Sequence, residues 1–329
     1  MLRHNAHDSL MADLRAYMES RIILTASELD IFTFIDERPS TTDEISQRKG
    51  FNRRALARLL DAVTAAELLK KEGQTYSVTE RGRLLSSRHP ETVLPMALHM
   101  NRLWSTWGDL SNIVRKGGKG KRKHRDTRDD FIGAMDVVGR ALSVEIAATY
   151  DLNPFQRLLD IGGASGTYTV AFLRKNPHMK AVIFDLNEVI PLAQKRITVE
   201  RLTQRVDFVA GDFYRDELPE GCDLVLLSAI IHQNGPKENL NLFRKIEKAL
   251  IPGGAVLIRD HIMDETRTVS SAGALFAINM LVNTVSGNTY TFREIKDGLK
   301  KAGFRDIRLV RAGAERMDGL VEARKPASS

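Results

Sequence analysis

The fold is decided by the stretch Leu158-Leu159-Asp160-Ile161-Gly162-Gly163-Ala164-Ser165-Gly166, where an apolar strand runs through a bend of small residues into a helix. Glycines permit the tight turn and let a ligand approach the backbone closely. A dinucleotide-binding loop needs the pattern G-x-G-x-x-G after this strand. Counting from Gly162, Ala164 and Thr167 stand at the second and third glycine positions, so the NAD pattern fails. The stretch instead favours a cationic, nucleoside-containing ligand that has no pyrophosphate.

Strands and helices alternate on both sides of this stretch, from about residue 150 to the C-terminus. The expected strands are residues 157–161, 181–185, 206–210, 222–228 and 255–260. The expected helices between them are residues 166–176, 189–199 and 236–250. Such alternation predicts a doubly wound, Rossmann-like α/β domain with a mainly parallel sheet over residues 150–329.

Acidic residues stand at or near the ends of three successive expected strands: Asp160, Asp185 and Asp212. Asp185 can accept hydrogen bonds from both ribose hydroxyls, although it can also cap a helix. In Gly211-Asp212-Phe213, the carboxylate can accept from an adenine amino group and the ring can contact the base, although a plain turn has the same composition. Open α/β sheets bind ligands in the crevice at these strand ends. The order of the three carboxylates is stronger evidence than any one of them.

Helices followed by a hairpin make up residues 1–90. We expect a helix over residues 9–36, another opened by the capping pattern from Ser40 to Ile45, a third from Asn52 to Ala65, and a hairpin over 69–78 with its turn at Glu72-Gly73. This order predicts a winged helix. The residues alone leave two uses open: a DNA reader whose recognition helix carries three arginines, or a dimerising module.

Residues 91–149 form a helical connector that contains a basic loop at 115–128. Helices are expected over 90–114 and 130–149. The loop accounts for most of the net charge of +7. Nucleic-acid binding by the loop is disfavoured because no aromatic residues are interleaved for base stacking, which leaves a solvated loop as the simpler interpretation.

The single cysteine, Cys222, allows no intrachain disulfide and no cysteine-based zinc site, which fits a cytoplasmic protein. The N-terminus lacks the apolar core of a signal peptide, and no run of about 20 apolar residues predicts a membrane span.

The motifs at Asp160–Gly166, Asp185, Gly211–Phe213 and Leu250–Gly254 resemble the ordered motifs of class I S-adenosylmethionine (SAM) methyltransferases. The N-terminal winged helix, the Trp-rich connector and two further stretches, Phe131–Met135 and Ile230–His232, resemble the small-molecule O-methyltransferases. That family includes caffeate and acetylserotonin O-methyltransferases and bacterial polyketide tailoring enzymes. The resemblance covers nearly the whole chain and implies an α/β, Rossmann-like doubly wound methyltransferase domain preceded by an α-helical winged-helix dimerisation domain.

The resemblance also implies SAM as the cofactor, a homodimer formed through the N-terminal domain, and a small-molecule acceptor. The residues expected to bind the cofactor are Asp160, Gly162, Gly163, Gly166, Asp185, Leu186, Gly211, Asp212, Phe213 and Ser228. Those expected to bind an aromatic or hydrophobic acceptor are Met100, Trp104, Phe131, Met135, Phe276 and Met280, although core packing explains the same composition.

His232 follows the strand at 222–228, and in the family the histidine at this position is the general base. Asp260 matches an acidic position that flanks it. A structural histidine and a turn aspartate are the alternatives. Two departures weaken the match: Gln233 stands where many relatives have Asp, and Thr289 lies in a later loop that lacks their second acidic residue.

Other functions stay open beside O-methylation. They are C- or N-methylation by positioning alone, a regulator that binds SAM as an effector, and, less favoured, an NAD-dependent oxidoreductase. No metal site is expected, because Asp260 and His261 are successive residues of a strand and point to opposite faces.

Overall fold

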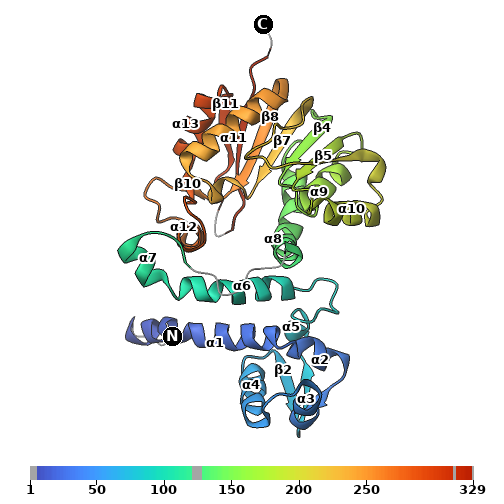
Figure 1. Ribbon diagram of the computed structural model, residues 1–329, viewed down its shortest axis with the longest axis vertical. Coiled ribbons are helices and arrows are strands. Elements are labelled where there is room, and N and C mark those ends of the chain that lie inside the picture. Colours follow the sequence, from blue (N-terminus) through green and yellow to red (C-terminus); the bar gives the residue numbers. More distant parts are fainter. Residues whose placement is uncertain (1–5, 121–127, 314–315, 328–329) are drawn as a thin grey trace, which may run out of the picture. The chain divides into compact units, whose positions relative to one another are not determined.

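The computed structural model describes residues 6–120, 128–313 and 316–327. The chain folds into two compact units, residues 1–104 with 123–137 and residues 105–122 with 138–329 (Figure 1). The predicted domain boundaries at residues 90 and 149 remain a prediction. Lys121, Arg122, Lys123 and Arg125 of the predicted basic loop lie outside the described residues.

The N-terminal unit is mainly helical and contains one small sheet. Its helices are α1 (Ala6–Glu28), α2 (Ile31–Glu37), α3 (Thr42–Lys49), α4 (Arg53–Ala65) and α5 (Glu80–Arg83). Its strands are β1 (Ser40–Thr41), β2 (Leu69–Glu72) and β3 (Thr75–Val78), paired antiparallel in the order β1-β3-β2. The helices α6 (Leu94–Trp107) and α8 (Arg128–Thr149) each run from this unit into the C-terminal unit.

Capping side chains begin the helices of this unit where the sequence predicts. The Thr41 hydroxyl accepts from the Glu44 amide, and the Glu44 carboxylate accepts from the Thr41 amide, a complete capping box for α3. Asn52 caps α4 by accepting from the Ala55 amide at 3.0 Å. Apolar faces of these helices, including Phe32 and Leu60, are fully buried in one core.

Three local predictions are wrong. The single helix expected over 9–36 is two helices, because Asp30 adopts a left-handed backbone (φ 54°) that ends the hydrogen-bond ladder between α1 and α2. The expected helix 90–114 likewise breaks into α6 and α7 (Leu110–Lys116). The hairpin turn lies at Gly73-Gln74, since Glu72 pairs with Thr75. Hydrophobic spacing continues across such breaks, so periodicity alone does not reveal them.

The C-terminal unit is built on a seven-stranded sheet with the order β11-β12-β8-β7-β4-β5-β6. Its strands are β4 (Arg157–Ile161), β5 (Lys180–Asp185), β6 (Val206–Ala210), β7 (Cys222–Ser228), β8 (Leu250–Asp260), β11 (Arg305–Arg311) and β12 (Gly319–Arg324). The five strands from β8 to β6 are parallel. β12 runs antiparallel to both of its neighbours, β8 and β11. The mainly parallel sheet is confirmed.

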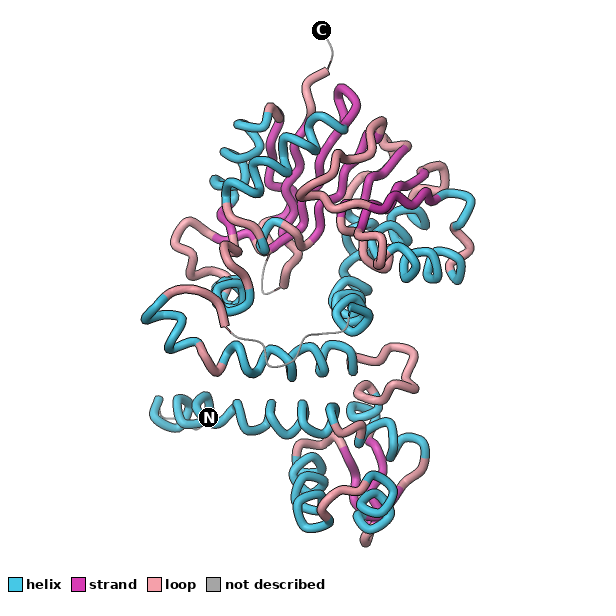
Figure 2. The backbone as a smooth tube through the Cα atoms, viewed as in Figure 1, coloured by secondary structure: helices cyan, strands magenta, loops and turns pink. Residues whose placement is uncertain are grey.

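Helices cover both faces of this sheet (Figures 1 and 2). They are α9 (Thr167–Lys175), α10 (Ile190–Val199), α11 (Pro236–Ala249) and α13 (Phe292–Ala302). A further helix, α12 (Ser271–Asn283), lies beyond the strand ends (Figure 1) and contributes no residue to the two cores of the sheet. One core lies between the sheet and α8, α9 and α10, and the other between the sheet and α11 and α13. Leu224 and Leu226 of β7 belong to the first core, whereas Val225 and Leu227 belong to the second. Residues of one strand therefore alternate between the two faces.

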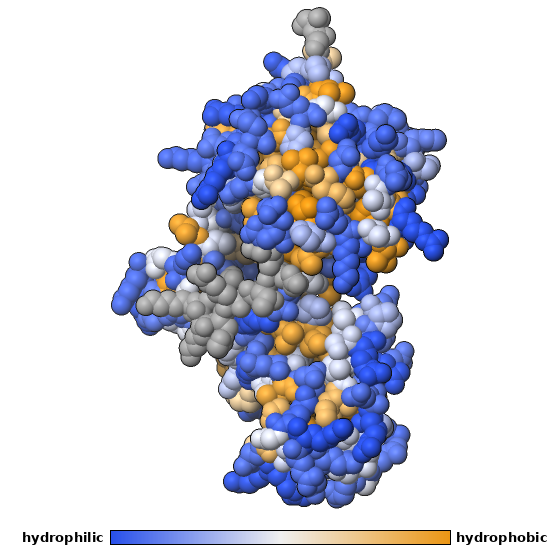
Figure 3. Space-filling view, turned by 45° about the vertical axis from the view of Figure 1, so that its right-hand side comes forward, coloured by the Kyte–Doolittle hydropathy of each residue, from blue (hydrophilic) through white to orange (hydrophobic). Residues whose placement is uncertain are grey.

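Short elements complete the unit. They are β9 (Ile262–Met263), β10 (Tyr290–Thr291) and the 3₁₀ turns η1 (Thr203–Arg205) and η2 (Ile231–Gln233). Among the described residues, no helix combines the length and the apolar character that crossing a membrane requires. Figure 3 shows hydrophobic residues at the surface of the molecule among the charged ones.

Candidate active site

The bend after β4 contains three residues with a left-handed backbone conformation. Gly162 and Gly166 have φ values of 65° and 77°, and Ala164 has 49°, which is uncommon for a residue with a side chain. A Cβ atom at Gly162 would lie 2.9 Å from the Ile230 side chain, and one at Gly163 would lie 3.0 Å from the Asp160 carboxyl carbon. The left-handed backbone at Gly162 and the close approach of Asp160 to Gly163 therefore favour glycine at both positions, which carry no side chain over the bend.

Asp185 ties the end of β5 to this bend. One of its carboxylate oxygens accepts from the Ala164 amide at 2.8 Å, and the other accepts from the Leu186 amide at 2.7 Å. The side chain is half-buried, and Leu186 is exposed beside it. A carboxylate at the end of this strand is a group that accepts hydrogen bonds from the hydroxyls of a ligand.

Asp160 lies beneath the bend and is only 2% exposed. Its carboxylate accepts a hydrogen bond from the Thr169 hydroxyl at 2.6 Å. Burial, together with the nearby charge of Asp185, raises the pKa of Asp160 to about 7, and hydrogen bonds from Thr169 partly oppose the rise. The site therefore holds a carboxylate whose ionisation a neighbouring cation would favour.

The end of β6 carries the third predicted acidic residue. The Gly211 amide donates to the Asp185 carbonyl at 2.9 Å, and a Cβ at Gly211 would lie 2.5 Å from the Phe184 ring. Asp212 accepts from the Tyr214 amide at 2.9 Å. The Phe213 ring lies close to Gly162, 3.7 Å from where a Cβ would be. The structure thus brings the ends of β4, β5 and β6 together, as the sequence predicts.

His232 and Asp260 form a buried pair across 28 residues of sequence. The histidine Nδ1 lies 2.9 and 3.0 Å from the two carboxylate oxygens. The side chains are 12% and 1% exposed. Burial alone would raise the pKa of Asp260, but the charge and hydrogen bond of His232 hold it below its usual value. Because Asp260 accepts from Nδ1–H, the neutral ring carries its lone pair on Nε2.

Phe276 of α12 is the nearest aromatic neighbour of this pair. Its ring meets the His232 ring edge to face at 4.8 Å and lies 4.9 Å from the His261 ring. Met280 lies one helical turn further and is 7% exposed. Both histidines therefore contact one phenyl ring. Among the described residues, no group of three histidine, cysteine or acidic side chains is arranged to hold a metal ion.

The positions that depart from the family pattern, Gln233 and Thr289, are uncharged. Gln233 is half-buried, and Asn234 beside it is buried and donates to the Asn239 side chain at 3.0 Å. The Asn288 amide donates to the His232 carbonyl at 2.8 Å, and Thr289 beside it is 2% exposed. The loop that lacks the second acidic residue thus supports His232 through the backbone. Within the described part of the chain, Asp260 is the carboxylate bonded to the ring.

The remaining predicted acceptor residues belong to the N-terminal unit. They are Met100, Trp104, Phe131 and Met135. The Arg21 guanidinium lies 5.2 Å from the Trp104 ring centre, and the His99 ring meets Phe131 edge to face at 5.5 Å. Met100, Trp104 and Phe131 are exposed, and Met135 is half-buried. Their contact with an acceptor stays a prediction.

Sequence reasoning missed a polar cluster on the opposite face of β8. Arg259 is 4% exposed, and its Nε donates to the Ser228 hydroxyl at 2.8 Å. The guanidinium lies 5.2 Å from the Tyr168 ring centre. Ser228 was predicted, but Tyr168 and Arg259 were not. The available signal was a charged residue directly after the apolar run Ala255–Ile258 of a buried strand.

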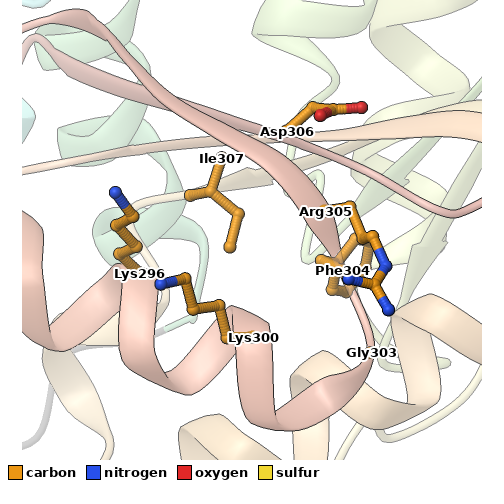
Figure 4. Close-up of a pocket in the computed structure, with 7 residues that line it drawn as sticks. All are labelled: Lys296, Lys300, Gly303, Phe304, Arg305, Asp306 and Ile307. Carbon is orange, nitrogen blue, oxygen red and sulfur yellow. The ribbon is translucent and has the colours of Figure 1, made fainter.

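A separate surface pocket of about 550 Å³ lies where α13 meets β11 (Figure 4). It is lined by Lys296, Lys300, Gly303, Phe304, Arg305, Asp306 and Ile307. It contains none of the predicted site residues, and its lysines lie on an exposed helix face.

Known proteins resemble the chain over its whole length. A family model described as the O-methyltransferase domain matches residues 119–305, and one described as the O-methyltransferase dimerisation domain matches residues 11–88. The tetracenomycin polyketide synthesis 8-O-methyl transferase TcmO of Streptomyces glaucescens is 33% identical over 94% of each chain. The acetylserotonin O-methyltransferase of Gallus gallus is 28% identical over 90% of this chain and 92% of its own.

A solved structure agrees with these relatives. The crystal structure of human N-acetylserotonin methyltransferase in complex with SAM has a TM-score of 0.86 at 26% identity, covering 99% of each chain. The resemblance and the fold class stated from the sequence are confirmed. Since the catalytic-domain model matches more than half of the residues and TcmO is similar over nearly all of them, the chain belongs to the O-methyltransferase family, as a SAM-dependent enzyme with an N-terminal dimerisation domain.

Proposed function

We propose that this enzyme transfers a methyl group from SAM to a hydroxyl of a small aromatic metabolite, with His232 as general base and Asp260 as its orienting partner. The observation that carries the proposal is the buried His232–Asp260 pair, which leaves Nε2 as the basic atom of the neutral ring. Among the described residues Nε2 has no hydrogen-bond partner. A substrate hydroxyl can therefore bond to it.

The cofactor residues suit an adenosyl ligand. Asp185 places a carboxylate, which accepts from ribose hydroxyls, at the end of β5 beside the bend. Phe213 lies beside the bend for the base, and the glycines keep the backbone accessible. The ionisable Asp160 beneath the bend suits a ligand that carries positive charge. SAM, when bound, supplies a methyl group activated by its sulfonium charge. We propose that Asp160, Gly162, Gly163, Gly166, Asp185, Leu186, Gly211, Asp212, Phe213 and Ser228 hold it.

The task of the chain is to align the acceptor and to remove its proton. A free phenol has a pKa of about 10, so ionising it at pH 7 costs roughly 4 kcal/mol. The acceptor oxygen forms the bond to the methyl carbon as the sulfur–carbon bond breaks, and its proton passes to Nε2 of His232. Asp260 then stabilises the imidazolium that results, because its buried carboxylate already bonds Nδ1. General-base assistance of this kind is worth about 10²- to 10⁴-fold in rate.

An aromatic acceptor is supported by the wall of the site. Phe276 presents its ring at 4.8 Å from the base, and Met280 follows on the same helix. Methionine and phenylalanine side chains adapt to flat apolar molecules. The names of two relatives, an 8-O-methyl transferase of tetracenomycin polyketide synthesis and a hydroxynaphthoate 3-O-methyltransferase, support the same class of acceptor.

The test uses the purified protein with SAM that carries an isotopically labelled methyl group. We offer hydroxylated polycyclic aromatics beside the same compounds already methylated on oxygen. Mass spectrometry should find one labelled methyl on oxygen in the free phenols and none in the blocked ethers. Label on carbon or nitrogen, or transfer to the blocked ethers, would show that the acceptor atom is not a hydroxyl.

The dimer is proposed to form through the N-terminal unit, which the dimerisation-domain model supports. One helix of this unit, α1, exposes more than half of the surface of four large apolar side chains: Leu10, Leu14, Tyr17 and Met18. Exposed apolar faces of this kind mark interaction surfaces. Leu14→Asp should therefore convert the protein to a monomer in analytical ultracentrifugation, whereas Asp13→Asn on the same helix should not. A dimer that survives Leu14→Asp rules out this face.

A further inference from the structure

Arg259 is a buried cation whose bonds go to uncharged groups. Its Nε donates to the Ser228 hydroxyl and its Nη1 donates to the Met317 carbonyl, both at 2.8 Å. Among the described residues it forms no ion pair within salt-bridge distance. The carboxylate of Asp260 is adjacent in sequence, but it bonds His232 on the other face of β8. Buried charges are normally paired, so this guanidinium calls for an anion.

Tyr168 provides a second donor at the same place. Its side chain is 8% exposed, and its ring centre lies 5.2 Å from the Arg259 guanidinium. In the described part of the chain its hydroxyl makes no hydrogen bond of standard geometry. Burial raises the pKa of Tyr168, and the charge of Arg259 and the neighbouring Ser228 side chain oppose that rise. A buried hydroxyl without a hydrogen bond of standard geometry is rare and calls for an explanation. An anion between the two groups would satisfy both.

The fold places this cluster at one end of the glycine bend. Tyr168 lies in the first turn of α9, directly after the bend, and Ser228 and Arg259 are paired at the ends of β7 and β8. In the sheet order β8-β7-β4-β5, the cluster lies on one side of the β4 bend and Asp185 lies on the other. A ligand whose ribose binds Asp185 and which runs along the bend therefore directs its other end toward Arg259.

We propose that Arg259 and Tyr168 bind the carboxylate of the methionyl part of SAM. The inference rests on the proposed cofactor site and assigns it two residues that the sequence did not single out. The guanidinium and the phenol each donate to a carboxylate oxygen, and a charge-assisted bond from Arg gives the contact its strength. An acceptor carboxylate fits less well, because the proposed base lies on the opposite face of β8.

The experiment compares SAM with decarboxylated SAM, which keeps the sulfonium and the amine and lacks only the carboxylate. Calorimetry on the full-length protein should show at least about tenfold tighter binding of SAM, the scale of one hydrogen bond to a charged group. Arg259→Gln should weaken the binding of SAM about tenfold or more, and it should change the affinity for decarboxylated SAM by less than about threefold. Tyr168→Phe should lower the ratio of the affinity for SAM to the affinity for decarboxylated SAM, by a smaller factor than Arg259→Gln does.

A matched control removes another arginine whose hydrogen bonds go to uncharged groups. Arg205 donates to the carbonyls of Leu173, Asn176 and Met179, away from the cluster, so Arg205→Gln should leave the ratio unchanged. If Arg259→Gln fails to fold, Arg259→Lys and Tyr168→Phe carry the test. Equal weakening of both ligands, or an unchanged ratio, overturns the inference. A wild-type protein that binds no SAM at all overturns the proposed cofactor site itself.

Discussion

The ends of β4 and β8 carry two carboxylates that are equally buried and yet behave in opposite ways. Asp160 and Asp260 are 2% and 1% exposed. The pKa of Asp160 is raised to about 7, whereas the pKa of Asp260 is lowered. Burial raises both, so the difference comes from their partners. Asp160 has the neutral hydroxyl of Thr169 and lies near another acid, whereas Asp260 has His232.

The comparison shows that burial by itself does not set the charge of a strand-end carboxylate. At β8 the hydrogen bond from His232 favours the ionised carboxylate, which can then stabilise the imidazolium when the base takes up a proton. At β4 the partner among the described residues is the neutral Thr169 hydroxyl, so a positively charged ligand would favour the ionised form of Asp160. The two strand ends thus correspond to the acceptor side and the cofactor side of the proposed reaction.

The largest expected effect is on turnover, and it distinguishes the acceptor side of the site from the cofactor side. His232→Ala should lower turnover at least a hundredfold, because the general base is lost, while SAM affinity stays nearly unchanged. Steady-state rates and calorimetry measure the two quantities. His178→Ala, an exposed histidine of the same unit, is the control. Unchanged turnover in His232→Ala removes this residue from the mechanism.

A smaller loss is expected when the partner of the base is neutralised. Asp260→Asn keeps an oxygen that can accept from Nδ1–H but loses the charge that stabilises the imidazolium. We expect turnover to fall about ten- to a hundredfold, within the range of general-base catalysis. SAM affinity should again change little. Turnover equal to that of the wild type would mean that the pair is structural.

The third prediction concerns the cofactor side. If the cation of SAM binds beside Asp160, binding favours the ionised carboxylate. The affinity for SAM should then increase about tenfold for each unit by which the pH is raised toward 7, and it should stay constant above pH 7. Titrations at several pH values measure the slope. Asp160→Asn should abolish it, and Asp207→Asn, at an exposed position of β6, should keep it. A slope that survives Asp160→Asn belongs to another group.

The smallest effects are on stability, and they should have opposite signs. The raised pKa of Asp160 destabilises the folded protein as pH rises from about 4 to 7, so Asp160→Asn should gain melting temperature relative to wild type over that range. The lowered pKa of Asp260 stabilises the folded protein above about pH 4. Asp260→Asn should therefore lower the melting temperature near neutral pH, and this difference from the wild type should shrink as the pH falls below about 4. Thermal melts of ligand-free protein, with shifts of a few degrees, test both signs.

Much of the fold was predictable because its signals are local. The alternation of strands and helices after residue 150, the capping pattern at Thr41 and the bend at Gly162 each depend on about ten consecutive residues. The errors at Asp30 and at the 72–75 turn arose where one backbone conformation reverses the chain without interrupting the hydrophobic spacing.

The sequence by itself determined the doubly wound domain, the order of the acidic strand ends, and His232 and Asp260 as candidates. Only the tertiary structure decided that Nδ1 of His232 meets both oxygens of Asp260, that the buried Asp160 bonds the neutral Thr169 hydroxyl, and that Arg259 faces Tyr168. The physical reason is that strand order, register and side-chain direction set such meetings between residues far apart in the chain. No local pattern records which side chains will share a buried space or what charge that space will support.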